Sequence, residues 1–193
     1  MEESITRPYR LAKELSQLFD LESKIEKALS VSMYQLNKFM NAERSSIFIF
    51  QHWDDHLTIF SSLDLGKDKI RIPKSCGVAG WVFVNRKPAL VNNAYDDPRF
   101  YKDIDATTGF TTRNLICTPL LLSKDQCLGT IQSLNKRNGD FTNDDLELLE
   151  LAASMIAIAI NNKRIYTEMM VTSKAHKKFI KQITQNVGNI FDQ

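Results

Sequence analysis

The sequence predicts one α/β domain of the α+β type, in which an antiparallel sheet is accompanied by helices at both ends of the chain. Apolar residues recur at helical spacing from about Tyr9 to Met40, and again from Thr142 nearly to the C-terminus. Between these regions, pairs of β-branched and aromatic runs are separated by polar stretches of hairpin length. A chain of 193 residues with 43% hydrophobic content is long enough to bury one substantial core.

Residues 1–41 are expected to form an N-terminal helical segment, as one broken helix or two consecutive helices. Its apolar stripe includes Leu11, Leu29 and Met40. Asp20 to Ser23 mark the expected break, because Asp and Ser favour helix caps over helix interiors.

The runs that follow predict the strands of the sheet and one short helix. The segment GVAGWVFVNRK has the apolar spacing of a short helix, with glycines where the backbone must approach another group closely. In chain order, the strands are SSIFIF and LTIFSSL around the loop QHWDDH, IRIP ending at Pro73, PALVN, and finally NLICTPLLL and CLGTIQSLNK around SKDQ.

Residues 93–113 are polar, aromatic and without a clear period. A connection of roughly twenty residues is longer than usual, and loops of that length are commonly binding loops or lids. This segment is the first indication of a binding site.

A long helix is expected after Thr142, because acidic residues such as Asp144 and Asp145 occupy its first turn. Its apolar stripe continues past the length that one compact domain can cover, as a coiled-coil seam does. We therefore expect residues 167–193 to be a coiled-coil linker helix that pairs with a second copy of the chain. The stripe comprises Leu148, Leu151, Met155, Ile158, Asn162, Ile165, Met169, Thr172, His176, Phe179, Ile183, Asn186 and Ile190.

The composition gives little indication of a charged partner. With 25 basic and 23 acidic residues, the formal net charge is +2, so neither nucleic acid nor a membrane surface is an expected partner. No apolar run of membrane-spanning length and no signal sequence is evident, so we expect a cytoplasmic protein. Cys76, Cys117 and Cys127 lie in mostly apolar surroundings, which favours reduced, buried thiols.

Motifs of catalysis and of metal binding are weak. The segment His52 to His56 clusters imidazoles and carboxylates, but a polar hairpin loop explains it, and no further ligands stand at a recognisable spacing. The sequence has no HExxH, no phosphate-binding glycine loop ending in Lys-Ser/Thr and no GxSxG. Acidic pairs such as Asp96-Asp97 have local explanations as turns and caps. We therefore expect neither a metal site nor an enzyme.

Three runs, IRIPKSCGVAGWV, AYDDPRFYKDIDATTGFTTRNLIC and NKRNGDFTNDD, together with the order of the elements, resemble a GAF domain. The resemblance covers about Ala42 to Tyr166 and is closest to the cyclic-nucleotide-binding GAF domains of mammalian phosphodiesterases and bacterial adenylyl cyclases. It implies a GAF fold over residues 42–166, with the terminal helices on one face of the central antiparallel sheet and a ligand pocket on the other.

The resemblance also implies which residues bind a ligand. Ser46 and Phe60 would line the base pocket, with Phe60 stacking on a purine. Val78 and Ala79 would bring the first turn of the short helix to the cyclic phosphate, which suits backbone N–H groups at a helix N-terminus. The lid positions, where the ribose and the phosphate are contacted, match Tyr101, Asp105, Thr108 and Thr112.

Two departures from the family pattern bear on purine preference. Ser61 stands where nucleotide-binding relatives commonly carry Asp, and Gln132 stands where some carry Glu. Without these carboxylates the site loses acceptors suited to the N1 and N2 donors of guanine. Because Ser and Gln both donate and accept hydrogen bonds, we expect a preference for cyclic AMP over cyclic GMP.

The resemblance assigns a structural signature to Asn135, Lys136, Phe141 and Asp145, with Leu146 in place of the family's final Glu. These residues would not contact the ligand. Instead, an ion pair between Lys136 and Asp145 would tie the last strand to the long helix.

The expected function is that of a regulatory sensory domain, which binds a cyclic nucleotide and passes the signal through a helical dimer to an output domain such as a cyclase, phosphodiesterase or kinase. The alternative is a GAF dimerisation or interaction module that has no nucleotide ligand. A tetrapyrrole sensor is less favoured, because Cys117 lacks the adjacent His of the usual attachment context.

Overall fold

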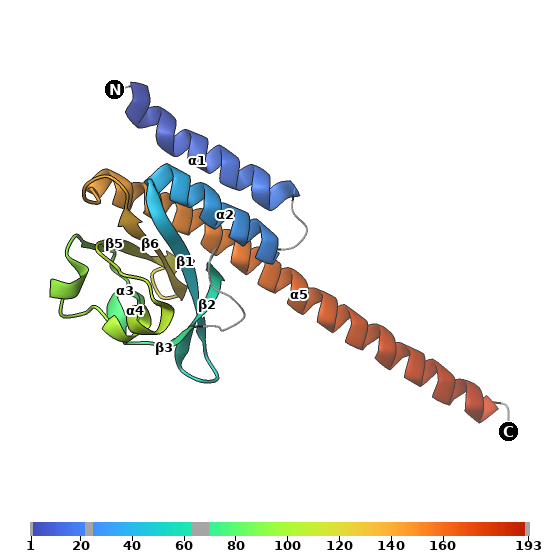
Figure 1. The fold of residues 1–193 in the computed structure, drawn as a ribbon. Helices are drawn as coiled ribbons and strands as arrows, with labels where there is room; N and C mark the ends of the chain where they lie inside the picture. The colour runs from blue at the N-terminus through green and yellow to red at the C-terminus, as the bar shows by residue number, and fades with distance from the viewer. Residues whose placement is uncertain (1, 22–24, 63–69, 192–193) are drawn as a thin grey trace. The chain divides into compact units, whose positions relative to one another are not determined.

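The computed structural model describes the backbone of residues 2–21, 25–62 and 70–191, and the side chains at 6–19, 25–60, 70–174 and 177 (Figure 1). Its centre is a six-stranded antiparallel sheet in the order β3-β2-β1-β6-β5-β4. The strands are β1 (Ala42–Gln51), β2 (His56–Ser62), β3 (Arg71–Pro73), β4 (Ala89–Val91), β5 (Leu115–Leu121) and β6 (Cys127–Lys136). These bounds confirm both predicted hairpins and the two short strands.

The helices confirm the predicted order of elements. The predicted break in the N-terminal segment falls between α1 and α2, and residues 22–24 lie outside the described part of the chain. The helices are α1 (Glu2–Leu21), α2 (Ile25–Met40), α3 (Gly77–Asn85), α4 (Lys102–Thr108) and α5 (Asn143–Phe191), with a 3-10 turn, η1 (Ala94–Asp96).

The expectation that residues 93–113 form an irregular loop is wrong in part, because this segment contains η1 and α4. The sequence of α4, KDIDATT, has no apolar period, so hydrophobic patterning gave no signal for it. Gly109 ends the helix in the left-handed conformation, with φ of 67°, and its N–H bonds the carbonyl of Asp105.

The sheet buries both faces because its central strands alternate between two apolar layers. Ile47 and its partner Ile131 are fully buried on one face of the sheet. On the other face, Phe48 and Leu134 belong to a second cluster of buried apolar residues. Helices α1, α2 and the first part of α5 cover one side, and α3 and α4 lie on the opposite side (Figure 1). The predicted GAF layering is therefore confirmed.

The chain divides into one compact unit, Met1–Ile158, and a second, Ala159–Gln193. Within the first unit, Leu11 of α1 and Leu29 of α2 are fully buried. In the second, Ile165 and Met169 of the predicted seam are exposed, and most side chains beyond Lys174 lie outside the described part. Among the described residues, no helix combines the length and apolarity needed to cross a bilayer.

Candidate functional site

A small cavity lies between the sheet and the layer of α3 and α4. Its free volume is about 60 Å³, well below the roughly 300 to 1,000 Å³ of typical small-molecule sites. A ligand of nucleotide size can enter only if part of the wall moves outward. The lining comprises Arg44, Ser46, Phe48, Ile59, Ile70, Ile72, Gly77, Val78, Ala79, Phe100, Tyr101, Ile104, Asp105, Thr108, Phe110, Thr112, Leu115, Gln132 and Leu134.

Most of the ligand-binding residues that the sequence suggested meet at this cavity, although they come from five separate segments of the chain. Eight of them line it, namely Ser46, Val78, Ala79, Tyr101, Asp105, Thr108, Thr112 and Gln132. The backbone of Ser61 lies in β2 opposite Ile47, and its side chain is outside the described part.

The structure does not place Phe60 in the cavity lining. The β1–β2 register shifts between Ile47, which pairs with Ser61, and Phe48, which pairs with Ile59. Phe60 is therefore the extra residue of a β-bulge, and its ring is 42% exposed while Ile59 lines the cavity. A bulge redirects a side chain without leaving a trace in the apolar pattern of the sequence.

Asp105 lies in the wall of the cavity, but its carboxylate is already bonded to protein groups. It is 7% exposed and accepts hydrogen bonds from the N–H of Thr112 at 2.6 Å and from its hydroxyl at 2.8 Å. The hydroxyl of Tyr95 donates to it as well, at 3.1 Å. Asp105 therefore fastens α4 to η1 and to the segment that leads into β5.

The N-terminus of α3 faces the same cavity. Val78 and Ala79 stand in its first turn, where N–H groups have no partner within the helix. Gly80 lets this turn lie close to the preceding chain, since an added Cβ would be 2.6 Å from the carbonyl carbon of Ser75. The turn can therefore accept an anion without any basic side chain.

Three ionisable groups near α3 and α4, namely Cys76, Tyr95 and Tyr101, have raised pKa values, which favours their neutral forms. Burial and the nearby carboxylate of Asp103 raise the pKa of the Cys76 thiol. A hydrogen bond to Asp103 raises the pKa of Tyr101, and partial burial together with Asp105 raises that of Tyr95. At neutral pH these groups act as neutral hydrogen-bonding partners of the wall.

Sequence reasoning missed a cation at the cavity. Arg44 of β1 lines it, and its guanidinium lies 4.1 Å from the ring centroid of Phe110. An Arg in a strand normally indicates a solvated position, and no sequence signal connects it with Phe110. The pair adds hydrogen-bond donors and an aromatic surface to the site.

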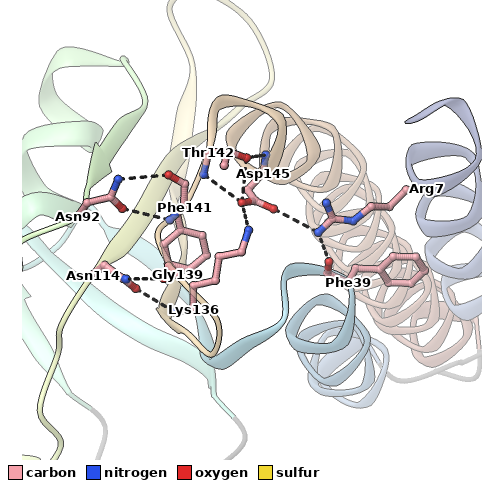
Figure 2. A network of polar contacts seen from close by, with 9 residues as sticks. All are labelled: Arg7, Phe39, Asn92, Asn114, Lys136, Gly139, Phe141, Thr142 and Asp145. Carbon is pink, nitrogen blue, oxygen red and sulfur yellow. Dashed lines mark hydrogen bonds and ion pairs between the residues drawn. The ribbon is translucent and has the colours of Figure 1, made fainter. Parts of the chain in front are cut away.

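Lys136, Phe141 and Asp145 of the predicted structural signature belong to one network of polar contacts (Figure 2). Asn135 accepts a bond from the Arg113 N–H at 2.7 Å and donates to the Thr111 carbonyl at 2.8 Å. Asn92 and the backbone of Phe141 exchange two bonds, of 3.2 and 3.1 Å. The chain before residues 93–113 is thus bonded to the connection between β6 and α5, and the end of that segment is bonded to the end of β6.

The ion pair between Lys136 and Asp145 is present, and it is nearly inaccessible to solvent, with side-chain exposures of 15% and 1%. Burial raises the pKa of the Asp145 carboxyl, but hydrogen bonds from Lys136 and Thr142 outweigh burial, so this pKa lies below its usual value. Neither residue lines the cavity. They join β6 to the start of α5.

The described residues give little support for a metal site at the His52 to His56 segment or for a reactive cysteine. Asp54 pairs with Arg71, and Asp55 pairs with Lys74 at 2.8 Å, as expected for hairpin side chains. Across the described ranges, no three acidic, His or Cys side chains are grouped so that they could hold a metal ion. All three cysteines are free, and burial raises the pKa of Cys117 far above its usual value.

Comparison with known proteins bears on the family and the fold of the chain. The profile of the GAF domain matches residues 24–160. The chain is 27% identical over 155 residues to the probable 3',5'-cyclic phosphodiesterase pde-5 of Caenorhabditis elegans. This alignment covers 72% of this chain and 21% of that protein. It is 27% identical over 169 residues to the dual 3',5'-cyclic-AMP and -GMP phosphodiesterase 11A of Takifugu rubripes, covering 81% and 18% respectively.

The chain thus spans about a fifth of the length of these curated relatives. Among solved structures, the GAF domain of a phosphoenolpyruvate-protein phosphotransferase from Coxiella burnetii superposes with a TM-score of 0.75 at 16% identity, over 84% of this chain and 98% of that one. At that identity, the similarity establishes the fold alone.

Proposed function

Because this chain belongs to the GAF domain family, we propose that it is a regulatory domain that binds a purine 3',5'-cyclic nucleotide in the cavity beside α3. The observation that carries the proposal is the convergence of eight family-matched positions on one cavity. The matched relatives are cyclic phosphodiesterases by name, and the matched part is a small share of each.

The cavity has donors suited to a cyclic nucleotide. The single phosphate charge would lie at the first turn of α3, near Val78 and Ala79. The base would lie between β1 and the lid, within reach of Ser46, Gln132 and the guanidinium of Arg44. Phe60 is not part of the present lining, so it would stack on the base only after the wall of the cavity has moved outward.

We further propose that cyclic AMP is preferred over cyclic GMP. Gln132 can donate as well as accept, which suits the mixed edge of adenine. Arg44 works against a large preference, since it offers only donors and guanine presents the acceptors N7 and O6 together. The expected preference is therefore small, on the order of tenfold or less.

Signalling would pass through α5 to an output domain, with two copies paired along the exposed apolar stripe of this helix. Ile158, Ile165 and Met169 are 57%, 45% and 66% exposed, which supports a partner along this stripe. A ligand shifts such a dimer only through different affinities for its two arrangements.

The free cysteines support the expected reducing cytoplasmic compartment.

The runner-up function is dimerisation without a nucleotide ligand, and the small volume of the cavity is the observation that favours it. Titration calorimetry of the chain with cyclic AMP and cyclic GMP separates the two. We expect saturable binding of both, tighter for cyclic AMP. In Gln132→Glu the order should reverse, because a carboxylate accepts from the N1 and N2 donors of guanine.

A Phe60→Ala variant completes this titration. Because Phe60 is 42% exposed, the variant should remain folded, with at most a small decrease in melting temperature. It should lose about 10- to 100-fold in affinity if the ring stacks on the base. Folded protein that gives no heat with either nucleotide would favour the dimerisation module, and unchanged affinity in Phe60→Ala would remove that residue from the site.

Removing the hydrogen bonds that hold α4 should make residues 102–110 more mobile without unfolding the domain. In Asp105→Ala, the bonds from Tyr95 and Thr112 are lost, so amides of 102–110 should exchange faster by about tenfold, and a bound nucleotide should dissociate faster. Thr107→Ala, on the exposed side of the same helix, is the control. Equal exchange in both variants would show that Asp105 does not hold the lid.

A further inference from the structure

Arg7, near the N-terminus of α1, reaches a carboxylate at the start of α5 (Figure 2). Its Nη2 lies 3.2 Å from Oδ1 of Asp145, a residue 138 positions away in the sequence. The same nitrogen also donates to the backbone carbonyl of Phe39, near the end of α2. One guanidinium therefore connects three helices.

Asp145 is the junction of this network rather than one end of a simple pair. Its Oδ2 accepts from the Thr142 N–H at 3.0 Å, and the Thr142 hydroxyl lies 3.3 Å from the Asp145 N–H, which forms a reciprocal cap on α5. Lys136 bonds the same oxygen from β6. Arg7 is the group that bonds the other oxygen, and it comes from α1.

Polar side chains surround the described start of α1, from Thr6 to Arg10. A groove of about 1,040 Å³ lies beside it, with a largely polar lining. The fully buried leucines of α1, Leu11 and Leu15, lie further along the helix. The lining of the groove comprises Thr6, Arg7, Pro8, Arg10, Glu14, Gln35, Lys38, Phe39, Asp144, Glu147 and Leu148.

Helix α1 also lies before the region that the family profile matches, residues 24–160, whereas Asp145 lies within it. We propose that Arg7 is a positioning residue that couples α1 to the first turn of α5. Through this contact, a displacement of α1 is passed to the start of the long helix without passing through the ligand cavity. The coupling is independent of whether the cavity binds a nucleotide.

The contact between Arg7 and Asp145 is weak enough to break and re-form while the domain stays folded. Arg7 is 40% exposed, so water screens the attraction, and its loss should raise local opening by about two- to fivefold. The Lys136 and Thr142 bonds keep α5 capped when Arg7 leaves. The domain therefore remains folded whether the contact between Arg7 and Asp145 is formed or broken.

Hydrogen exchange on the full chain tests the coupling, with Arg7→Gln, Arg7→Lys and Arg10→Gln compared with wild type. Arg10 is the matched control, because it is an exposed Arg on the same helix and lines the same groove. We expect Arg7→Gln to accelerate exchange about two- to fivefold in α1 and also in residues 143–149, with the melting temperature nearly unchanged. Arg7→Lys should be intermediate, since an ammonium restores the charge but not both bonds.

Two results would overturn the proposal. Arg7→Gln could accelerate exchange in α1 alone, in which case Arg7 only anchors its own helix. Alternatively, Arg7→Gln and Arg10→Gln could behave alike, in which case the loss of any positive charge from α1 explains the effect.

Discussion

Replacing Gly129 by alanine is expected to prevent the domain from folding stably. Gly129 lies in β6, opposite Ile49 of β1, at the centre of the sheet. An added Cβ would be 1.9 Å from the carbonyl oxygen of Phe48 and 2.9 Å from its carbonyl carbon. The neighbouring Thr130 and Ile131 pair with β5 as well as with β1, so moving β6 away from Phe48 would disturb both ladders. We expect a loss of at least about 4 kcal/mol, among the largest that single substitutions produce.

Gly109→Ala is the control for this substitution, because Gly109 has φ of +67° and nothing within 4 Å of an added Cβ. It should cost only the backbone strain of a left-handed residue, about 1 to 2 kcal/mol. Circular dichroism and urea unfolding at 25 °C measure both. A Gly129→Ala protein with native spectra and a stability within 1 kcal/mol of Gly109→Ala would show that the β1–β6 register tolerates a side chain.

The sequence predicted the sheet well because each strand carries its own local signal. β-branched and aromatic runs on either side of polar loops are sufficient to place a hairpin, and the loops at QHWDDH and SKDQ connect strands as expected. The resemblance then placed residues such as Ser46 and Gln132 at one cavity. Spacing alone could not have joined them.

The failures have a different origin, since they depend on contacts that no local pattern encodes. Helix α4 has no apolar period, and bonds from Thr112 and Tyr95 to Asp105 hold it in place. A register shift between two strands leaves Phe60 outside the present lining, and its contact with a base stays a prediction. Arg7 finds its partner across most of the chain, which leaves no sequence signal at either end.

Removing the buried ammonium of Lys136 is the second substitution with a large expected effect. In Lys136→Met, the buried Asp145 loses the buried cation of this pair and keeps only the contact at 3.2 Å with Arg7, whose side chain is 40% exposed. Breaking a buried pair from one side costs about 3 to 5 kcal/mol, because the remaining charge keeps its desolvation penalty. Lys74→Met is the matched control: Lys74 and Asp55 form a pair at 2.8 Å whose side chains are 45% and 61% exposed, so its loss should cost less than about 1 kcal/mol.

The double variant Lys136→Met, Asp145→Asn distinguishes an uncompensated charge from a simple loss of packing. The oxygen of the neutral amide can still accept from Thr142. Loss of the partly exposed Arg7 contact should cost less than about 1 kcal/mol, so the double variant should be more stable than Lys136→Met alone. Urea unfolding at pH 7 measures all four proteins. A double variant that is less stable than Lys136→Met would contradict the electrostatic explanation.

The same pair predicts how stability depends on pH. The pKa of Asp145 is lowered from 3.8 in the folded chain, so the folded state holds fewer protons there than the unfolded state as the pH falls. Its contribution is complete above about pH 5 and is lost as the pH falls below 3.8 toward the lower folded pKa. In Lys136→Met the carboxyl loses one of the two residues that lower its pKa and keeps the hydrogen bonds from Thr142, so part of this acid sensitivity should diminish. An equal loss of stability between pH 5 and pH 3 in both proteins would show that Lys136 does not set the pKa of Asp145.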